Sequence, residues 1–256
     1  KTSFVGGINM SDRYRNDHLA KTDLYWRDTH IMLHGAATAY LQYIFLCDWN
    51  FASNNKLIYS ESYFPGPSPT KEIGKEIVQL VPSGPDSDLP IIFYSLLGAI
   101  GAAKKKILIT SPYFIPGESL MDVLIIAAKS GLKVQIIVPG KSDSKMVNAA
   151  ARSYYTELLK YGVEIFLYNK GFVHAKTMVI DDDLAVVGSA NMDYRSFDLN
   201  FEINALIYGK EIAGQLKAAF LNDLEESSQI DCAEWLSRSK HVHLWEKVVR
   251  LLSPFL

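Results

Sequence analysis

Hydrophobic positions in the second half of the chain recur with the periods of alternating strands and helices. Short apolar runs predict strands at residues 106–110, 134–138 and 163–168, and amphipathic patterns predict helices at residues 118–129 and 144–160 between them. Strands separated by helices of this length indicate an α/β domain with a mixed, mostly parallel sheet and helices on both faces.

The hydrophobic period changes to two residues further along the chain. Residues 172–180 and 184–188 flank three consecutive aspartates, a pattern typical of a β-hairpin. The longest apolar run, residues 91–103, is shorter than the roughly 18–20 residues needed to cross a bilayer, so we expect a buried helix there. Proline, glycine and serine gather at residues 63–70 and 82–90, which predicts loops or a linker.

Two blocks of sequence occur twice along the chain. Residues 3–10 match residues 185–192 at an offset of 182, and residues 26–35 match residues 200–209 at an offset of 174. Both copies place an acidic residue seven positions before a glycine that opens an amphipathic helix. We therefore expect a duplicated fold whose first copy is truncated near Lys1.

The composition is that of a globular protein large enough for one large domain or two small ones. Of its 256 residues 48% are hydrophobic and 21% charged, which excludes disordered and low-complexity classes. The formal charge of −2 lacks the basic excess of proteins that grip nucleic-acid backbones, so no nucleic-acid partner is expected. Cys47 and Cys232 lack metal-ligand spacing, and we expect two buried thiols in a reducing compartment.

The second copy carries the candidate chemistry. Residues two apart on a strand share a face, so His174 and Lys176 should place an imidazole beside an ammonium group and form a phosphate site. Asp181 has the other parity and lies at the hairpin turn, where we expect it to brace the turn or pair with a distant base. Glu202 is expected to accept the second ring N–H of His174, which leaves the other ring nitrogen free to attack.

A glycine-containing turn follows the hairpin. The backbone of the run Gly188-Ser189-Ala190-Asn191 can approach a ligand closely, and the Ser189 hydroxyl and Asn191 amide can donate to phosphate oxygens. The preceding His-x-Lys-x4-Asp run together with this Gly-Ser-x-Asn run resembles the signature of the phospholipase D superfamily.

Segments along nearly the whole chain are most similar to bacterial cardiolipin synthases within that superfamily. They lie at residues 6–14, 26–35, 45–49, 82–86, 111–116, 195–202 and 251–254. The resemblance implies an α/β/α sandwich duplicated about a pseudo-two-fold axis, with two His-x-Lys motifs facing each other. One histidine attacks phosphorus to form a phosphohistidine and the other protonates the leaving alcohol, without a metal or other cofactor.

The resemblance implies a transferase that joins two phosphatidylglycerol molecules into cardiolipin and releases glycerol. It assigns catalytic roles to His174, Lys176, Asp181 and Glu202, and phosphate-binding roles to Asn191, Ser189, Asn9 and Gly7. Asp28 is assigned to orient the histidine of the first motif.

That first motif falls outside this sequence. The offset of 182 places the counterparts of His174, Lys176 and Asp181 before Lys1, so we expect them in a missing N-terminal half and expect this piece alone to be nearly inactive. His30 and His34, on the strand face expected to include Asp28, are weaker candidates to approach the site.

The expected organisation is a first-lobe remainder at residues 1–62, a linker at residues 63–90 and a second lobe with the complete motif at residues 91–256. The resemblance implies phospholipid and a membrane surface as partners. It also implies attachment to the cytoplasmic membrane through an N-terminal region absent here, with this portion itself soluble.

Two smaller expectations concern surfaces. Residues 112–116 and 172–173 are expected either to form a rim facing acyl chains or to pack in the core. The region from Asp231 should form a helix on the second lobe, with His241 and His243 exposed.

Three alternatives remain open at this point. The same phosphohistidine serves hydrolysis when water arrives second, so a phospholipase D-type phosphodiesterase acting on phospholipid or nucleic acid is the first. The second is a non-catalytic lipid-binding module that keeps a phosphate pocket. The third is an assembly of two chains that each supply one motif.

Overall fold

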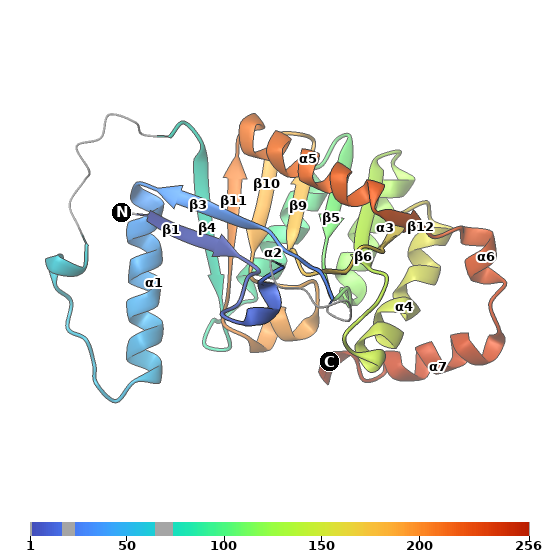
Figure 1. Cartoon of the computed structure of the whole chain (residues 1–256), viewed down its shortest axis with the longest axis horizontal. Helices are drawn as coiled ribbons and strands as arrows, with labels where there is room; N and C mark the ends of the chain where they lie inside the picture. The colour runs from blue at the N-terminus through green and yellow to red at the C-terminus, as the bar shows by residue number, and fades with distance from the viewer. Residues whose placement is uncertain (1, 17–23, 65–73, 256) are drawn as a thin grey trace.

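An eight-stranded sheet runs through the computed structural model of the chain, which describes residues 2–16, 24–64 and 74–255 (Figure 1). In sheet order the strands are Ser227–Gln229 (β12), Glu164–Tyr168 (β7), Lys133–Pro139 (β6), Lys106–Thr110 (β5), Thr177–Ile180 (β9), Leu184–Gly188 (β10), Glu202–Tyr208 (β11) and Ile77–Ser83 (β4). The α/β class is confirmed. The sheet is mixed as expected, but parallel pairing is restricted to β5, β6 and β7, because the hairpin strands and both edge strands join antiparallel.

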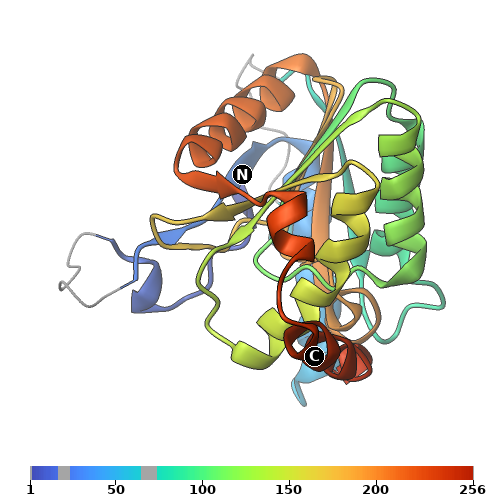
Figure 2. The same ribbon diagram turned by 90° about the vertical axis from the view of Figure 1, so that its right-hand side faces the viewer.

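Helices cover both faces of this sheet, as the alternating pattern predicts (Figure 2). One layer holds Ile91–Ala102 (α2), Gly117–Lys129 (α3) and Lys145–Lys160 (α4), and the other holds Lys210–Glu225 (α5). Within β5, Ile107 and Ile109 join the cluster with α2, α3 and α4, whereas Leu108 joins the cluster with α5. Successive side chains of a strand point to opposite faces, so a continuous apolar run serves two cores at once.

The predicted elements of the second half agree with the structure to within a residue or two. Ser144 caps α4 through a hydrogen bond that its hydroxyl accepts from the backbone N–H of Val147. Beyond α3, Gly131 has φ 88°, a conformation that favours glycine and ends the helix.

The predicted strand at residues 172–180 is interrupted at the motif. Phe172–Val173 (β8) pairs in parallel with Trp26–Arg27 (β2), and β9 begins only at Thr177. His174 and Lys176 therefore lie on an irregular segment between two sheets, and the prediction of a continuous strand through them is wrong. The pairing of β8 with β2 draws the chain out of the large sheet at this point.

The sequence repeat corresponds to two hairpins with the same register. Thr2–Gly6 (β1) pairs with His30–His34 (β3), matching Thr2 to His34, and β10 pairs with β11, matching Leu184 to Tyr208. These pairs differ by the sequence offsets of 182 and 174. The helix after each hairpin, Ala36–Ala52 (α1) or α5, begins directly after a glycine. The repeat is confirmed.

The expectations about the linker and about the two cysteines need correction. β4 occupies residues predicted as linker and includes Pro82; because β4 is an edge strand, a residue without a backbone N–H is tolerated there. The loop therefore starts at Gly84, and most of the predicted loop at residues 63–70 lies outside the described residues. Cys47 is exposed and Cys232 only half-buried, because α1 buries only Leu46 and Cys232 lies at the first turn of a short surface helix.

The C-terminal region forms Cys232–Leu236 (α6) and Lys240–Arg250 (α7), which both pack on α4. His241 is exposed as expected, whereas His243 is half-buried. The remaining short elements are Asp12–Tyr14 (η1), Glu61–Tyr63 (η2), Arg195–Leu199 (η3) and Ser253–Phe255 (η4). Within the described ranges, no helix combines the length and the apolar character that crossing a bilayer requires.

Candidate active site

His174 is held by residues of the first sequence copy. Its backbone N–H donates to the carbonyl of Arg27 at 2.7 Å, and its ring Nδ1 lies 2.8 Å from Oδ2 of Asp28. The other carboxylate oxygen of Asp28 accepts the backbone N–H of Thr29 at 2.7 Å, which fixes its orientation. A carboxylate partner assigns the proton to Nδ1, so the lone pair of His174 lies on Nε2.

The expectation that Glu202 holds His174 is wrong; Asp28 does so. β2 pairs with β8, so the residue after Arg27 comes to lie against the residue after Val173. Glu202 instead accepts hydrogen bonds from the Asn200 amide at 3.1 Å and from the Ser189 hydroxyl. Burial raises the pKa of the Glu202 carboxyl, and these two hydrogen bonds partly offset that rise.

Lys176 lies directly against the imidazole. Its Nζ is 2.9 Å from Nε2 and 2.9 Å from Nδ1 of His174, and it donates to the His174 carbonyl at 2.7 Å. Burial lowers the pKa of Lys176 to about 8, although the carboxylates of Asp28, Glu202 and Asp193 raise it. The ammonium group is therefore a buried positive charge close to three acidic side chains.

Aromatic rings enclose the imidazole on several sides. The ring centres of Tyr14, Trp26 and Phe172 lie 5.6, 5.4 and 5.9 Å from that of His174. The Tyr14 hydroxyl lies 3.4 Å from Nδ1 of His174 and accepts a hydrogen bond from the Asn9 side chain at 3.0 Å. The His174 side chain keeps 10% of its surface accessible, so the enclosure is not complete.

The glycine-containing turn brings further polar groups to this end of the sheet. Oδ1 of Asn191 is buried without a hydrogen-bond partner among the described residues, while its backbone N–H donates to the Ser196 hydroxyl. Asp193 accepts the backbone N–H of Ser196, and burial raises the pKa of the Asp193 carboxyl. The Ser189 hydroxyl is bound to the backbone of Ile203 at 2.9 Å as well as to Glu202, so it serves the turn itself.

Asp181 lies at the far end of β9 and braces the turn, as its parity predicts. Its carboxylate accepts the backbone N–H groups of Lys104, Lys105 and Lys106 at 2.6–2.9 Å. Partial burial raises the pKa of Asp181, but these three donors outweigh it and the net shift is downward. The left-handed backbone at Asp181, φ 56°, suits an aspartate in a tight turn.

Of the candidate residues in the first copy, Gly7 and His30 lie near Asp28, whereas His34 lies elsewhere. Gly7 lies against Asp28, and a Cβ at Gly7 would meet the carboxylate oxygen at 2.5 Å, so only glycine fits. His30 is half-buried, and burial lowers its pKa while Asp28 raises it. His34 lies at the other end of β3 and hydrogen-bonds Thr2, so it does not approach the site.

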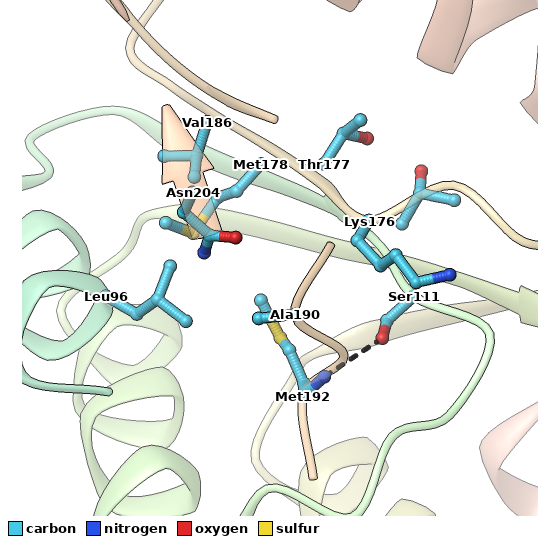
Figure 3. Close-up of a pocket in the computed structure, with 10 residues that line it drawn as sticks. Leu96, Ser111, Lys176, Thr177, Met178, Val186, Ala190, Met192 and Asn204 are labelled. Atoms are coloured by element: carbon cyan, nitrogen blue, oxygen red, sulfur yellow. Dashed lines mark hydrogen bonds between the residues drawn. The ribbon is translucent and has the colours of Figure 1, made fainter. Parts of the chain in front are cut away.

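Two cavities lie beside these groups. The smaller, about 10 Å³, is lined by Lys176, Ser111 and Asn204 (Figure 3) and has room for about one water molecule. The larger, about 320 Å³, opens beside Ser189 and Glu202 between α1 and the end of β4. Only the second has room for part of an organic substrate.

Of the two alternatives for residues 112–116 and 172–173, an acyl-facing rim or core packing, the structure shows core packing. Phe114, Ile115, Phe172 and Val173 are all at most 1% exposed and belong to the core, because β8 and the segment after β5 pack beneath the site. Tyr113 is half-exposed and donates its hydroxyl proton to Asp143 at 2.7 Å. Within the described ranges, no three His, Cys, Asp or Glu side chains are grouped as metal ligands would be.

Several neighbours of His174 were not singled out from the sequence. Trp26 and Tyr14 occur in segments that resemble the family, but aromatic residues without periodicity carry no signal of their own. Arg27 anchors β2 through an ion pair at 2.8 Å with Asp223 of α5, a contact between residues too far apart in sequence to be inferred.

Comparisons with known proteins identify the family of this chain and several relatives. Residues 96–224, about half of the chain, match the family model described as cardiolipin synthase, PLD-like domain. A cardiolipin synthase of Listeria welshimeri serovar 6b is 45% identical over 255 residues, which are 99% of this chain and 52% of that protein. The major cardiolipin synthase ClsA of Bacillus subtilis (strain 168) is 45% identical over 256 residues, 100% of this chain and 52% of that protein.

The chain thus spans about half the length of the curated relatives it matches. Among solved structures, phosphatidylserine synthase of Haemophilus influenzae Rd KW20 superposes with a TM-score of 0.71 at 17% identity, covering all of this chain and 68% of that one. Nuc from Salmonella typhimurium, a phospholipase D family member, gives 0.53 at 20% identity, covering 61% of this chain and 99% of that one. These two share the fold. The family match and the relatives together show that this chain belongs to the phospholipase D-like cardiolipin synthase family.

Proposed function

We propose that the protein containing this chain transfers a phosphatidyl group between two phosphatidylglycerol molecules, giving cardiolipin and glycerol. The observation that carries the proposal is the arrangement Asp28–His174–Lys176, in which Nδ1 of the ring meets a carboxylate and an ammonium group lies within 2.9 Å of both ring nitrogens. Relatives named cardiolipin synthase over 99% of the chain supply the reaction class.

The proposed reaction has two displacements at phosphorus. In the first, Nε2 of one histidine attacks, a phosphorus–nitrogen bond forms, and the bond to the glycerol oxygen breaks. A second histidine gives its proton to the departing glycerol. In the second displacement, a hydroxyl of the next phosphatidylglycerol attacks phosphorus and gives its proton to that second histidine. The phosphorus–nitrogen bond breaks, and the first histidine is free again. His174 fills one of these roles and the histidine of the first motif fills the other.

The neighbours of His174 have separate tasks in this proposal. Asp28 keeps the lone pair on Nε2 and stabilises the ring when it becomes positively charged. Lys176 and Asn191 balance charge that develops on the phosphorus oxygens, an effect worth roughly 10²–10³ in rate per donor. Asp181 acts only through the turn that it braces and does not touch substrate.

Glu202 has a different assignment from the expected one. It is the sequence counterpart of Asp28, and Asp28 of the first copy serves the histidine of the second. By the same crossover, Glu202 of the second copy would serve the histidine of the first motif. The cavity of about 320 Å³ beside Glu202 would then receive that ring and part of a headgroup.

The wider organisation is proposed on the same basis. Residues 1–62 belong to one lobe and the eight-stranded sheet, with β4 at its edge, belongs to a second lobe; the two lobes share one active site. The enzyme works on phospholipid at a membrane surface.

Product analysis of the complete protein with phosphatidylglycerol tests the function. Cardiolipin and glycerol in equal amounts support the transferase, and phosphatidic acid as the main product supports a hydrolase with the same intermediate. Replacing His174 with Ala should abolish turnover, because the ring has no substitute; a near-normal rate contradicts the assignment. Robust synthesis by this chain alone contradicts the need for a second motif.

A further inference from the structure

We propose that the outward face of α7 is a docking surface for an anionic phospholipid bilayer. The apolar face of α7 consists of Leu244, Trp245, Val248, Leu251 and Leu252, the last two in the turn that ends the helix. This proposal rests on the proposed function, in that it adds a contact between the enzyme and the lipid layer that holds its substrate.

The apolar side of α7 faces solvent, which is the reverse of an ordinary surface helix. Leu244, Trp245 and Val248 are 61%, 59% and 48% exposed, and Leu251 is 77% exposed. Positions 244, 248 and 251 follow a helical spacing of four and three residues and therefore share one face. A surface helix normally turns such a stripe toward the core, so this one requires a separate explanation.

The inward face of α7 instead carries a buried charge. Glu246 is 3% exposed and binds Arg238 at 2.8 Å and Arg152 at 3.2 Å. Val249 is the other fully covered residue of the helix. The ion pairs fix how the helix is rotated, because turning the apolar face inward would leave Glu246 without its partners.

The charges around this face fit an anionic surface. Lys240 and Lys247 lie seven residues apart on the flank of the apolar face, and both are exposed. The single acidic residue between Lys240 and Phe255 is Glu246, which is buried and paired. An amphipathic helix with basic residues beside an exposed apolar face binds anionic lipid interfaces, where a tryptophan sits well at the headgroup level.

The position of α7 agrees with a membrane-facing role. In Figure 1 the helix lies along the lower edge of the molecule, the edge toward which β4 runs and at which Glu202 lies. At its C-terminal end, the Arg250 guanidinium lies 4.1 Å from the ring centre of Tyr154 in α4. α7 and the end of the sheet that carries Glu202 therefore lie along the same edge of the molecule.

Vesicle binding by the chain tests the proposal. Vesicles of phosphatidylglycerol and phosphatidylcholine should bind it, whereas vesicles of phosphatidylcholine alone should bind at least about tenfold more weakly. The double variant Leu244→Glu/Val248→Glu should lose at least about tenfold in affinity, because it places two acidic groups on the apolar face. The double variant Ile126→Glu/Leu221→Glu, which changes two exposed apolar residues on other helices, should bind like the wild type.

Two further measurements test whether α7 itself enters the lipid layer and whether docking is independent of catalysis. Fluorescence of Trp245 should shift to shorter wavelength with anionic vesicles, and Trp245→Phe should remove that shift. His174→Ala should bind vesicles normally, so loss of cardiolipin synthesis and loss of docking are distinguishable. Thermal unfolding of each variant shows whether it remains folded.

Three outcomes would overturn the proposal. In the first, the wild-type chain does not bind anionic vesicles. In the second, both double variants bind anionic vesicles equally well. In the third, the wild-type chain is a dimer and Leu244→Glu/Val248→Glu is a monomer. The last result, seen by analytical ultracentrifugation, would assign the face to contact between copies of this chain.

Discussion

Oδ2 of Asp28 lies 2.8 Å from Nδ1 of His174 although the two residues are 146 positions apart in sequence. They belong to different copies of the internal repeat, so the candidate site is assembled across the copies. The pairing of β2 with β8 produces this contact, because each residue directly follows its strand.

Replacing Asp28 with Asn should lower the activity of the complete protein by about 10²–10⁴, because the charged imidazole loses its carboxylate partner. Nitrogen NMR of the ring should show the proton of His174 leaving Nδ1 for Nε2 in this variant. The matched change Glu202→Gln should leave the His174 ring signals unchanged. The opposite pattern, with only Glu202→Gln affecting the ring, would mean that Glu202 holds His174 after all.

The buried charge of Lys176 lowers the free energy of unfolding at neutral pH. Its pKa of about 8 in the folded chain, against 10.5 as the ordinary value, corresponds to about 3 kcal/mol of destabilisation while the group stays charged in both states. The unfolded chain binds more protons between pH 8 and 10.5, so stability rises with pH across that window.

We therefore expect Lys176→Met to raise the free energy of unfolding by about 1–3 kcal/mol at pH 7 while abolishing turnover. Urea unfolding at pH 7 and pH 10 measures the gain, which should shrink at the higher pH. Lys170→Met, at an exposed ion pair, should change stability by less than about 0.5 kcal/mol. A gain independent of pH would show that charge burial is not the cause.

Asp181 should matter for stability rather than for substrate contact. Asp181→Asn keeps a residue that tolerates the left-handed turn but removes one acceptor oxygen and the charge, so we expect a loss of about 1–3 kcal/mol. Because the folded-state pKa is lowered, the stabilisation is present above the unfolded value near 4 and disappears as pH falls through the folded value.

The exposed neighbour at the same turn provides the control. Asp183→Asn should change the unfolding free energy by less than about 0.5 kcal/mol. Unfolding curves at pH 7 and pH 3 should converge for Asp181→Asn and wild type at the lower pH. Equal stability of the two proteins at pH 7 would contradict the bracing role.

Gly7 should tolerate no side chain. A Cβ there would lie 2.5 Å from the Asp28 carboxylate, so Gly7→Ala should displace that group and reduce activity of the complete protein at least tenfold. Gly98 in α2 has open space around it, and Gly98→Ala should stabilise the chain by about 0.5–1 kcal/mol without affecting activity. Unimpaired turnover of Gly7→Ala would show that the carboxylate has room to move.

Local pattern predicted most of the fold. Strand and helix positions after Lys104 follow from apolar period and caps. The repeat predicted a duplicated fold, and the registers of β1 with β3 and of β10 with β11 differ by its offsets. The partner of His174 could not be predicted in this way. It depends on β2 crossing to β8, a two-residue parallel contact that leaves no periodic signal.

The orientation of α7 also depends on tertiary contacts rather than on periodicity. The stripe at positions 244, 248 and 251 would normally mark the core-facing side, but the pairing of Glu246 with Arg152 and Arg238 decides the rotation. Similarly, the aromatic rings around His174 come from three separate segments and converge only in the folded chain.

The crossing of Asp28 to His174 has an evolutionary consequence. After a gene duplication, two copies often drift apart and one decays, because the other keeps the ancestral task. Here the acid of one copy holds the imidazole of the other, so a mutation that damages one copy also impairs the function of the other. The two copies therefore form a single functional unit, in which neither imidazole nor acid works without the other copy.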